Sequence, residues 1–473
     1  MIRLRNTLTQ SKEALTPLEP GRVRLYVCGV TVYDHCHIGH GRVMVAFDVL
    51  SRLLRHEGLK TFYVRNITDI DDKILERAGD KGIPYERLTE GMIASFQGDM
   101  AWLGVQPPDV EPRATEHIQE MVALIERLLV KGVAYEAGGD VYFRVRSVPD
   151  FGALSKKELD ELIAGSRVEV NPKKLDPLDF VLWKAASDTD AGFPSPFGKG
   201  RPGWHIECSA MAMRYLGDLL DIHGGGEDLV FPHHENERAQ TLAATGKPLA
   251  NLWMHVGFVT MKDVKMSKSL GNTVYLRDLK ASYHPEALRV ALLSTHYRSP
   301  LDFSFELVEN TGRALYRFYL ARARQEARLR SGQGGKGRTK EARALKEEFL
   351  GSLKDDLNTP KAIGAIFKTL GLLQEKPGVD EETYKELLEL YKEADEILGA
   401  FGLEPYAFLE RIESAFFKEK RLDQGTLQEL VRERELARGQ KDFQRADAIR
   451  EQVKGYGVLL EDTPEGTLVR LDV

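Results

Sequence analysis

Two short segments far apart in the chain carry residues suited to binding phosphate. Residues 36–40 read Cys-His-Ile-Gly-His, and residues 265–269 read Lys-Met-Ser-Lys-Ser. His37 and His40 are three residues apart, so on a helical turn they share one face. Gly39 between them lets backbone and a nucleobase approach closely, and a helix N-terminus there favours anions. In isolation the two histidines have a simpler interpretation, as polar residues in a turn.

The lysine segment argues against that simpler interpretation. Lys265 and Lys268 lie in a Ser- and Gly-containing stretch between a predicted strand and a predicted helix, where their ammonium groups could close on a triphosphate. Adenylation of an acid needs stabilisation of the charge on the departing pyrophosphate, and it needs no covalent nucleophile on the enzyme. Together the two segments predict activation of an acid by ATP.

The elements around these segments predict an α/β fold. Residues 23–30 are a short apolar run typical of a buried strand, and a helical pattern from Arg42 ends at Gly58. Residues 61–67 form the next strand. Such a strand–helix–strand unit builds a doubly wound, Rossmann-type sheet, in which ligands bind at the carboxyl ends of the strands. The candidate residues at those ends are Cys28, His37, His40 and Thr68.

Length and composition limit the class of protein. With 473 residues the chain is expected to form two to four domains. No apolar run approaches the ~20 residues that cross a membrane, and the N-terminus lacks the apolar core of a signal peptide. Three cysteines in so large a chain argue against a disulfide framework and for a cytoplasmic protein. A net charge of -6 means that any site for a polyanion must be local.

The pattern of elements predicts three domains. Residues 1–309 form the α/β catalytic domain, with an insertion at about 116–203 and the lysine segment within 255–309. Residues 310–403 form a helical bundle with a basic linker, and residues 404–473 form a small mixed α/β domain.

A local excess of positive charge begins the helical part. From Arg313 to Lys346 there are eleven Lys and Arg residues but two acids, and residues 331–338 are rich in glycine. One interpretation is a solvated helix followed by a loop, and the other is an arm that contacts phosphates. Composition does not separate the two.

A third group of residues has the chemistry of a zinc site. His233 and Glu237 are i and i+4 on a predicted helix, although His234 with Glu237 is also geometrically possible. Two thiolates, from Cys28 and Cys208, would complete a reasonable zinc set. The spacing is not that of a zinc finger, and the alternative for the cysteines is two buried small hydrophobic residues.

A glycine-rich turn after another predicted strand is a candidate ribose site. Gly224 and Gly226 allow close approach of a ligand, and Asp228 can accept hydrogen bonds from ribose hydroxyls. This pattern alone is a weak signal.

These motifs resemble those of the bacterial-type cysteinyl-tRNA synthetases, a family within the class I aminoacyl-tRNA synthetases. The resemblance covers essentially the whole chain, with no departure at any motif position. The matching segments are 26–29, 36–42, 63–73, 111–115, 203–211, 221–226, 231–237 and the lysine segment.

The resemblance implies one zinc ion that binds the thiolate of substrate L-cysteine directly. Shape discriminates poorly against serine, by ~1–3 kcal/mol, whereas a thiolate suits zinc and a hydroxyl does not. The resemblance also favours His233 over His234 as the partner of Glu237. It assigns no ligand role to Cys36, which is then a packed thiol. The implied zinc ligands are Cys28, Cys208, His233 and Glu237, and the implied amino-acid pocket contains Gly29, Thr68 and Trp204.

The resemblance also implies a two-step reaction, in which cysteine attacks the α-phosphate of MgATP and the cysteinyl group then passes to tRNA(Cys). The helical bundle and the C-terminal domain would hold the tRNA, the latter at the anticodon. We expect a monomer without a membrane segment. The implied phosphate-stabilising residues are His37, His40, Lys265 and Lys268, and the implied ATP-binding residues are Gly39, His40, Gly224, Gly226, Asp228 and Lys268.

Three rival functions share part of this pattern. A cysteine ligase with an amino-sugar acceptor, as in mycothiol biosynthesis, would share every active-site motif but would lack a full anticodon-binding tail. Here the part from residue 310 onward is long enough for a separate domain. A non-catalytic RNA-binding relative would have lost motif histidines or lysines, and none is missing. The zinc set argues against another class I synthetase.

Overall fold

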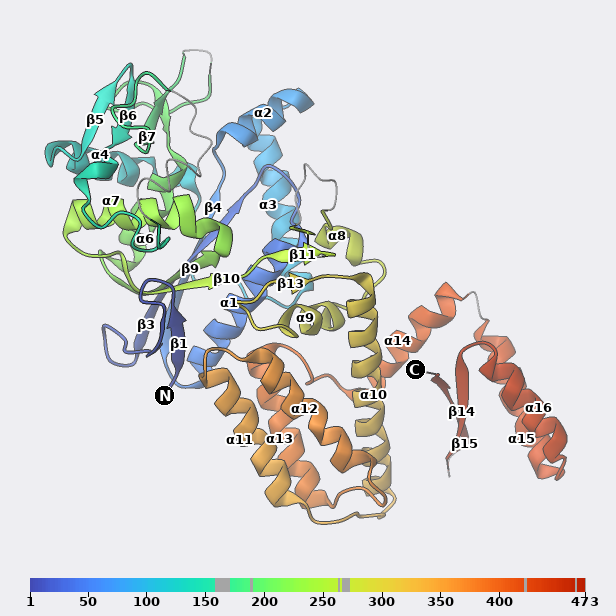
Figure 1. The fold of residues 1–473 in the computed structure, drawn as a ribbon. Coiled ribbons are helices and arrows are strands. Elements are labelled where there is room, and N and C mark those ends of the chain that lie inside the picture. The colour runs from blue at the N-terminus through green and yellow to red at the C-terminus, as the bar shows by residue number, and fades with distance from the viewer. Residues whose placement is uncertain are drawn as a thin grey trace. The chain divides into compact units, whose positions relative to one another are not determined.

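The computed structural model describes residues 1–157, 171–187, 190–262, 264–265, 273–420, 423–463 and 466–472. It divides into two compact units (Figure 1). The first unit contains Met1–Leu307, Glu347–Ala365 and Glu396–Gly399, and the second contains Val308–Lys346, Ile366–Asp395 and Ala400–Val473. Within the described residues, no helix is long and apolar enough to cross a membrane.

The first unit is built on a parallel four-stranded sheet, which confirms the predicted α/β class. Its strand order is β10-β9-β3-β4. The strands are β3 (Arg22–Thr31), β4 (Lys60–Thr68), β9 (Leu220–Gly226) and β10 (Ala250–Val256).

Helices cover both faces of this sheet, because alternate side chains of a strand point to opposite sides. In β9 a Cβ on Gly224 would collide with the ring of Phe47, so this face packs against α1 (Ile38–His56). The preceding His223 points the other way and lies 3.1 Å from Glu237 of α7 (Glu235–Thr245). That second face also carries α6 (Trp204–Leu216).

The predicted insertion lies within the first unit. It begins with α4 (Ile118–Val130) and contains an antiparallel sheet of order β5-β6-β7-β8. Trp183 and Phe143 are fully buried and share one hydrophobic cluster with Tyr26 and Cys28 of β3. The sheet's strands are β5 (Ala134–Ala137), β6 (Asp140–Phe143), β7 (Phe180–Ala185) and β8 (Gly200–Pro202).

Shorter elements complete the first unit. An N-terminal hairpin packs beside β10, and two helices follow β4. A three-stranded sheet of order β12-β11-β13 and two helices flank the lysine segment. These elements are β1 (Arg3–Asn6), β2 (Ser11–Ala14), α2 (Asp72–Lys81), α3 (Tyr85–Trp102), β11 (Val259–Met261), β12 (Val264–Lys265), α8 (Leu276–Leu279), α9 (Pro285–Leu293) and β13 (Leu301–Asp302).

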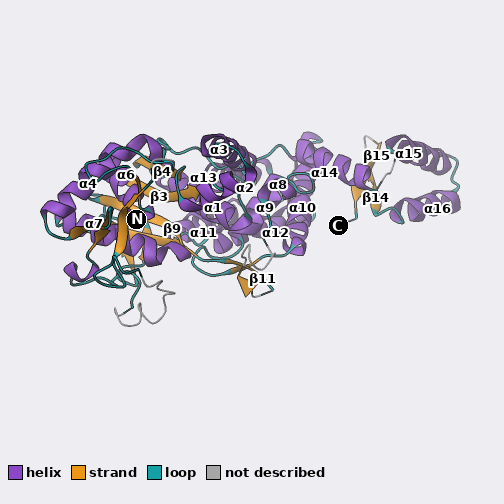
Figure 2. Cartoon of the chain, turned by 90° about the horizontal axis from the view of Figure 1, so that it is seen from above, coloured by secondary structure: helices purple, strands orange, loops and turns teal. Residues whose placement is uncertain are grey.

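From residue 305 onward the chain is almost entirely helical, as predicted (Figure 2). Asn358 accepts a hydrogen bond from the Lys361 backbone and so caps a helix at the predicted start. The helices are α10 (Phe305–Arg330), α11 (Thr339–Lys354), α12 (Thr359–Gln374), α13 (Glu381–Leu398), α14 (Pro405–Glu419), α15 (Gln424–Gly439) and α16 (Phe443–Lys454).

The C-terminal part also agrees with the sequence. The charged helical stretch breaks after Gly439, at the residue that ends α15. The predicted terminal hairpin is present as β14 (Val458–Thr463) and β15 (Gly466–Leu471), which pair antiparallel.

Several basic side chains of residues 313–346 form ion pairs with acidic residues of the second unit. Arg338 lies 2.6 Å from Glu375, and Lys346 lies 3.1 Å from Glu389. Lys336, in the glycine-rich stretch, also forms a backbone bridge with Val379. These contacts favour a solvated, ion-paired helical surface over an arm kept open for phosphates.

Candidate active site

The four candidate zinc ligands meet at the carboxyl end of the central sheet, although they come from four different elements. Cys28 lies on β3, Cys208 on α6, Glu237 on α7, and His233 in the turn Val230–His234 that precedes α7. Their candidate ligand atoms all lie within 4.8 Å of one another, and all four side chains are buried.

The short distances inside this cluster are one ion pair and two hydrogen bonds from a thiol. His233 Nε2 lies 2.9 Å from Glu237 Oε1, and the Cys28 thiol lies 3.4 Å from the same oxygen and 3.5 Å from Cys208 Sγ. Among the described residues, only histidines form ion pairs with Glu237. A buried carboxylate with no Lys or Arg beside it is well suited to a metal cation.

The electrostatics of the cluster also suit a metal. Burial raises the pKa of the Cys28 thiol well above its usual range. Burial would likewise raise the pKa of Cys208, but the hydrogen bond from Cys28 and the charge of His233 lower it to about 6. Burial opposes the charged form of His233, yet the Glu237 carboxylate raises its pKa to about 10. Cys28 and His233 therefore hold protons that a metal ion would displace.

The structure adds His223, which the sequence did not assign to this site, and it keeps His234, the alternative partner of Glu237, close to the cluster. His223, at the middle of β9, and His234 form a second possible ligand group with Cys28 and Glu237. His234 Nδ1 lies 2.8 Å from His255 Nε2, so imidazoles surround the cluster. The signal for His223 was its place next to Gly224, since alternation along a buried strand turns it to the face opposite α1.

The two histidines of the first phosphate motif form the N-terminus of α1. The helix begins at Ile38, four residues earlier than the helical pattern predicted, because His37 caps it. His37 Nδ1 accepts from the His40 backbone, and His40 Nδ1 accepts from the His37 backbone, both at 3.4 Å. The rings stack with centroids 3.7 Å apart. With Nδ1 accepting, each neutral ring carries its proton on Nε2 as a donor.

Gly39 lies under this stacked pair. A Cβ at that position would come within 2.9 Å of the His37 ring, so any larger residue would disturb the cap. The sequence predicted that Gly39 leaves room for a ligand. In this structure the room is taken by the imidazole of His37.

The residues that follow the second phosphate motif adjoin the first motif. The backbone of Lys265 pairs with Thr260 in the sheet of β11 and β12, and Lys268 lies outside the described residues. After the lysine segment, Val274 accepts a 3.0 Å hydrogen bond from the Ile38 backbone, and Leu276 donates one of 2.9 Å to Cys36. The fold thus brings the residues that follow the lysine segment against the first motif, across more than two hundred residues.

The candidate ribose turn is close-packed. A Cβ on Gly224 would lie 2.2 Å from Phe47, and one on Gly226 would lie 2.5 Å from a carboxylate oxygen of Asp228. Gly224 is therefore required by helix packing. Gly226 instead lets the exposed Asp228 fold back over the end of β9, where its carboxylate can face a ligand.

The candidate amino-acid pocket lies beside the metal cluster. Gly29 and Thr68 are at the carboxyl ends of β3 and β4, and Trp204 begins α6. The Trp204 indole stacks on the ring of His233 at 4.3 Å and keeps 36% of its surface exposed. Trp204 is therefore partly exposed beside a buried ligand, whereas Thr68 is buried.

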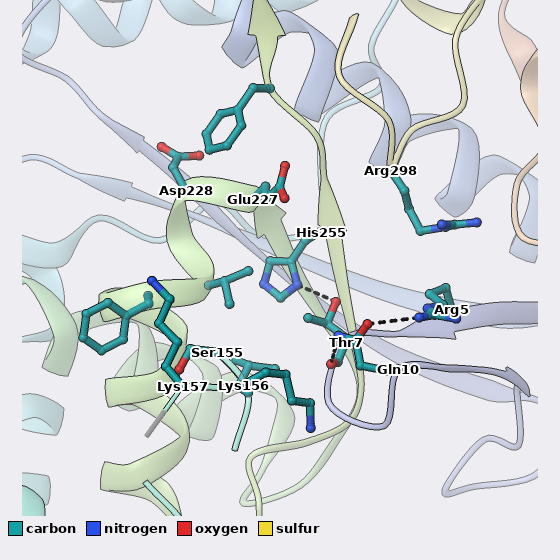
Figure 3. Close-up of a pocket in the computed structure, with 14 residues that line it drawn as sticks. Arg5, Thr7, Gln10, Ser155, Lys156, Lys157, Glu227, Asp228, His255 and Arg298 are labelled. Atoms are coloured by element: carbon teal, nitrogen blue, oxygen red, sulfur yellow. Dashed lines mark hydrogen bonds between the residues drawn. The ribbon is translucent and has the colours of Figure 1, made fainter. Parts of the chain in front are cut away.

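A pocket of ≈ 640 Å³ opens past the ends of β9 and β10 (Figure 3). His255 lies near its centre and contacts the Thr7 hydroxyl at 2.8 Å. Basic side chains face acidic ones across this pocket, so it can hold a ligand that carries both phosphates and hydroxyls. The charged lining residues are Arg5, Lys156, Lys157, Arg298, Glu227 and Asp228.

Comparison with known proteins agrees with this geometry. Residues 14–313 match the family described as tRNA synthetases class I (C) catalytic domain, and residues 348–402 match the DALR domain. The chain is 47% identical over 474 residues to a cysteine–tRNA ligase of Geobacter sulfurreducens, covering 98% of both chains. It is 48% identical over 471 residues to that of Chromohalobacter salexigens, again with 98% of both covered.

This chain belongs to the cysteine–tRNA ligase family. Its fold is also similar to the folds of more distant synthetases. Methionyl-tRNA synthetase of Mycobacterium tuberculosis, in complex with methionyl-adenylate, aligns with a TM-score of 0.60 and 17% identity, over 81% of this chain and 91% of that one. A leucyl-tRNA synthetase from Agrobacterium radiobacter aligns with a TM-score of 0.62 and 13% identity, over 83% and 86%. These matches show a shared class I fold.

Proposed function

We propose that this protein activates L-cysteine with MgATP to cysteinyl-adenylate and transfers the cysteinyl group to the 3′-terminal adenosine of tRNA(Cys). The observation that carries the proposal is the meeting of two thiols, an imidazole and a carboxylate beside Thr68 and Trp204, in a chain 47% identical to cysteine–tRNA ligases. The product serves protein synthesis, so we infer a cytoplasmic enzyme. We also propose that the enzyme acts as a monomer.

We propose that zinc is held by Cys28, Cys208, His233 and Glu237. The burial of the set and its two displaceable protons support this assignment. A bound zinc ion would supply a Lewis acid for the substrate thiolate, an advantage that the hydroxyl of serine does not share. The indole of Trp204, stacked on His233, then covers the pocket from the solvent side.

The phosphates of ATP would lie at the N-terminus of α1. The mutual capping of His37 and His40 uses their Nδ1 atoms as acceptors, so their neutral rings carry the proton on Nε2, and the first backbone N–H groups of a helix favour anions. Lys265 and Lys268 would add positive charge from the second motif as pyrophosphate leaves. Gly226 would border the nucleotide, and Asp228 would accept from the ribose hydroxyls, whereas Gly39 and Gly224 pack against the side chains of His37 and Phe47.

The tRNA would be held by the parts beyond the catalytic domain. We propose that residues 1–309 catalyse, that the bundle of residues 310–403 contacts the tRNA, and that residues 404–473 reach the anticodon. Residues 348–402 of this bundle match the DALR domain.

The test is charging of total bacterial tRNA with labelled cysteine, run beside cysteine-dependent ATP–pyrophosphate exchange. We expect both activities. Exchange without charging would move the acceptor to another molecule and favour an amino-sugar ligase. The absence of both, in zinc-loaded protein, would favour a non-catalytic RNA-binding relative.

A further inference from the structure

A buried carboxylate, that of Asp356, connects three segments of the first unit. Asp356 lies in the turn between α11 and α12 and is 1% exposed. Its Oδ1 accepts 2.8 Å hydrogen bonds from the backbone N–H of Arg5 and from the Tyr297 hydroxyl, and its Oδ2 accepts one of 2.8 Å from Arg298 Nε. One side chain therefore holds the N-terminal hairpin and residues 297–298 against the turn.

The backbone of this turn is itself held in a fixed conformation. Asp356 and Leu357 both have left-handed backbone, with φ of 64° and 50°. Such residues persist only where the surrounding structure holds them, and here Leu357 is fully buried while the Asp356 N–H donates a 2.8 Å hydrogen bond to the Arg3 oxygen. The carboxylate of Asp356 thus has a defined position from which to orient its partners.

Asp356 binds only one edge of the Arg298 guanidinium. Both Nε and Nη2 of Arg298 lie 2.8 Å from Asp356 Oδ2. A guanidinium has five N–H donors, and this edge uses one on Nε and one on Nη2, so the outer edge keeps both donors of Nη1 and the second of Nη2. The Arg298 side chain is 42% exposed although its partner is buried. Its outer edge has the forked geometry that matches a phosphate group.

This outer edge belongs to the wall of the ≈ 640 Å³ pocket. Arg298 and Arg5 lie on one side of the pocket, and Lys157 lies on the opposite side (Figure 3). The rings of Phe231 and Phe258 also line it. Positive charge combined with aromatic rings is the means by which proteins hold single-stranded nucleic acid.

The place of the pocket also suits the second substrate of the proposed reaction. Asp228, which we propose as the acceptor for the ATP ribose, lines the same pocket. The terminal hydroxyl of a tRNA has to reach the adenylate, so the last phosphates of the tRNA must come close to that nucleotide. Since the N-terminus of α1 is the proposed place for the phosphates of ATP, the Arg298 side of the pocket is left for the tRNA.

We propose that Arg298 contacts a backbone phosphate of the single-stranded 3′ end of the tRNA, and that Asp356 is the positioning residue that directs its guanidinium into the pocket. This inference rests on the proposed function. Asp356 is buried and touches no ligand itself, so it acts through Arg298. The pair therefore serves the transfer of the cysteinyl group and has no part in adenylate formation.

Replacing Arg298 with alanine tests the phosphate contact. We expect kcat/KM for tRNA in charging to fall by about tenfold or more, as for a lost hydrogen bond to a charged group, while cysteine-dependent ATP–pyrophosphate exchange stays unchanged. The plot of log tRNA affinity against log salt concentration should also become shallower by about one unit, because one phosphate contact is lost. Arg298→Lys keeps the charge and should keep the slope.

A double-mutant cycle tests the positioning role. In Asp356→Asn the amide oxygen can keep the contacts with Arg5 and Tyr297, whereas the NH₂ group would face the donors of Arg298. We expect this variant to lose charging selectively, and to lose no more when it is combined with Arg298→Ala. A merely structural role would lower exchange together with charging and would add to the loss in the Arg298 variant.

Arg55→Ala is the matched control. Arg55 is an arginine of the same unit with similar exposure, 35%, and its Nη2 lies 3.0 Å from the carboxylate of Asp109. It lies in the last turn of α1, at the opposite end of that helix from His37. Its replacement should change neither charging nor the salt dependence. Zinc content and circular dichroism of each variant confirm that the first unit is folded.

The outcomes separate this inference from the function on which it rests. Unchanged charging in Arg298→Ala would overturn the inference, and an equal loss of exchange and charging would overturn it by showing that the pocket serves ATP. Wild-type protein that exchanges pyrophosphate but charges no tRNA would instead overturn the proposed acceptor, and the inference with it.

Discussion

The guanidinium of Arg42 donates a 2.9 Å hydrogen bond to the backbone oxygen of Gly257. Arg42 follows His40 by two residues on α1, and Gly257 lies between β10 and β11, on the way to the lysine segment. The same guanidinium also donates to Phe258, His296 and Ser299 backbone oxygens. One buried side chain therefore connects the helix of the first phosphate motif to the strands that lead to the second.

Replacing Arg42 with lysine should slow adenylate formation selectively. Burial lowers the pKa of Arg42 to about 10, so the group is charged at neutral pH, and lysine keeps that charge. The ammonium group of lysine cannot reproduce the planar guanidinium, which donates hydrogen bonds to four backbone oxygens. We expect exchange to fall by at least about tenfold, or about 1.4 kcal/mol, with unchanged zinc content and KM for cysteine.

Arg322→Lys is the control for this substitution. Arg322 is a buried arginine of the second unit that also donates to backbone oxygens, those of Phe401 and Leu403. It should lower thermal stability and leave the rate of exchange per folded enzyme intact. Equal loss of exchange in both variants would show that Arg42 acts through general stability.

Cys208→Ser should weaken zinc binding and cysteine activation while the fold survives. Only one of four ligands is lost, and serine is nearly isosteric with cysteine. Zinc content by atomic spectroscopy and cysteine-dependent exchange should fall together, with an unchanged far-UV spectrum. Cys36→Ser, at a buried cysteine outside the ligand group, is the control. Normal zinc content in the Cys208 variant would refute the ligand assignment.

Zinc uptake by the metal-free protein should release protons. At pH 7 the His233 imidazole, whose pKa is raised to about 10, and the Cys28 thiol, whose pKa is also raised, both carry protons that metal ligands cannot keep. We expect about two protons per zinc, and an affinity that increases as the pH rises. Calorimetry in buffers of different ionisation enthalpy measures this number. Uptake without proton release would contradict the ligand set.

The buried ion pair of Asp48 with Arg289 should carry much of the stability of the first unit. Both side chains are 1% exposed, and Asp48 also accepts from Arg52 at 2.9 Å. Asp48→Asn leaves the Arg289 charge without compensation, which typically costs about 3–5 kcal/mol. Urea unfolding measures the loss. The exposed Lys385, 2.8 Å from Glu381, is the control, and Lys385→Ala should change the unfolding midpoint little.

Ending the chain at Lys420 should separate the two steps of the reaction. This cut removes α15, α16 and the terminal hairpin, but it keeps Phe408, whose ring stacks on Tyr319 in the helical core. We expect exchange to persist and charging to fall by at least about tenfold, equivalent to about 1.4 kcal/mol of tRNA binding. Equal loss of both activities would mean that the removed part supports the catalytic fold.

Local patterns predicted most of the elements. The buried strands, the helix caps at Asn358 and the break after Gly439 all depend on residues close in sequence. The start of α1 was predicted too late, at Arg42, because histidine is not among the usual N-cap residues. The mutual capping of His37 and His40 depends on the placement of two side chains, which periodicity does not report.

The sequence by itself determined the chemistry available to this protein: two thiols, an imidazole, a carboxylate and two phosphate motifs, in an order shared with one family. Only the tertiary structure decided which atoms meet. It turned His223 towards Glu237, paired Lys346 with Glu389, and placed Glu207 against Thr68. The reason is physical, since these contacts join residues 14 to 139 positions apart and depend on sheet order and packing, which short-range patterns do not encode.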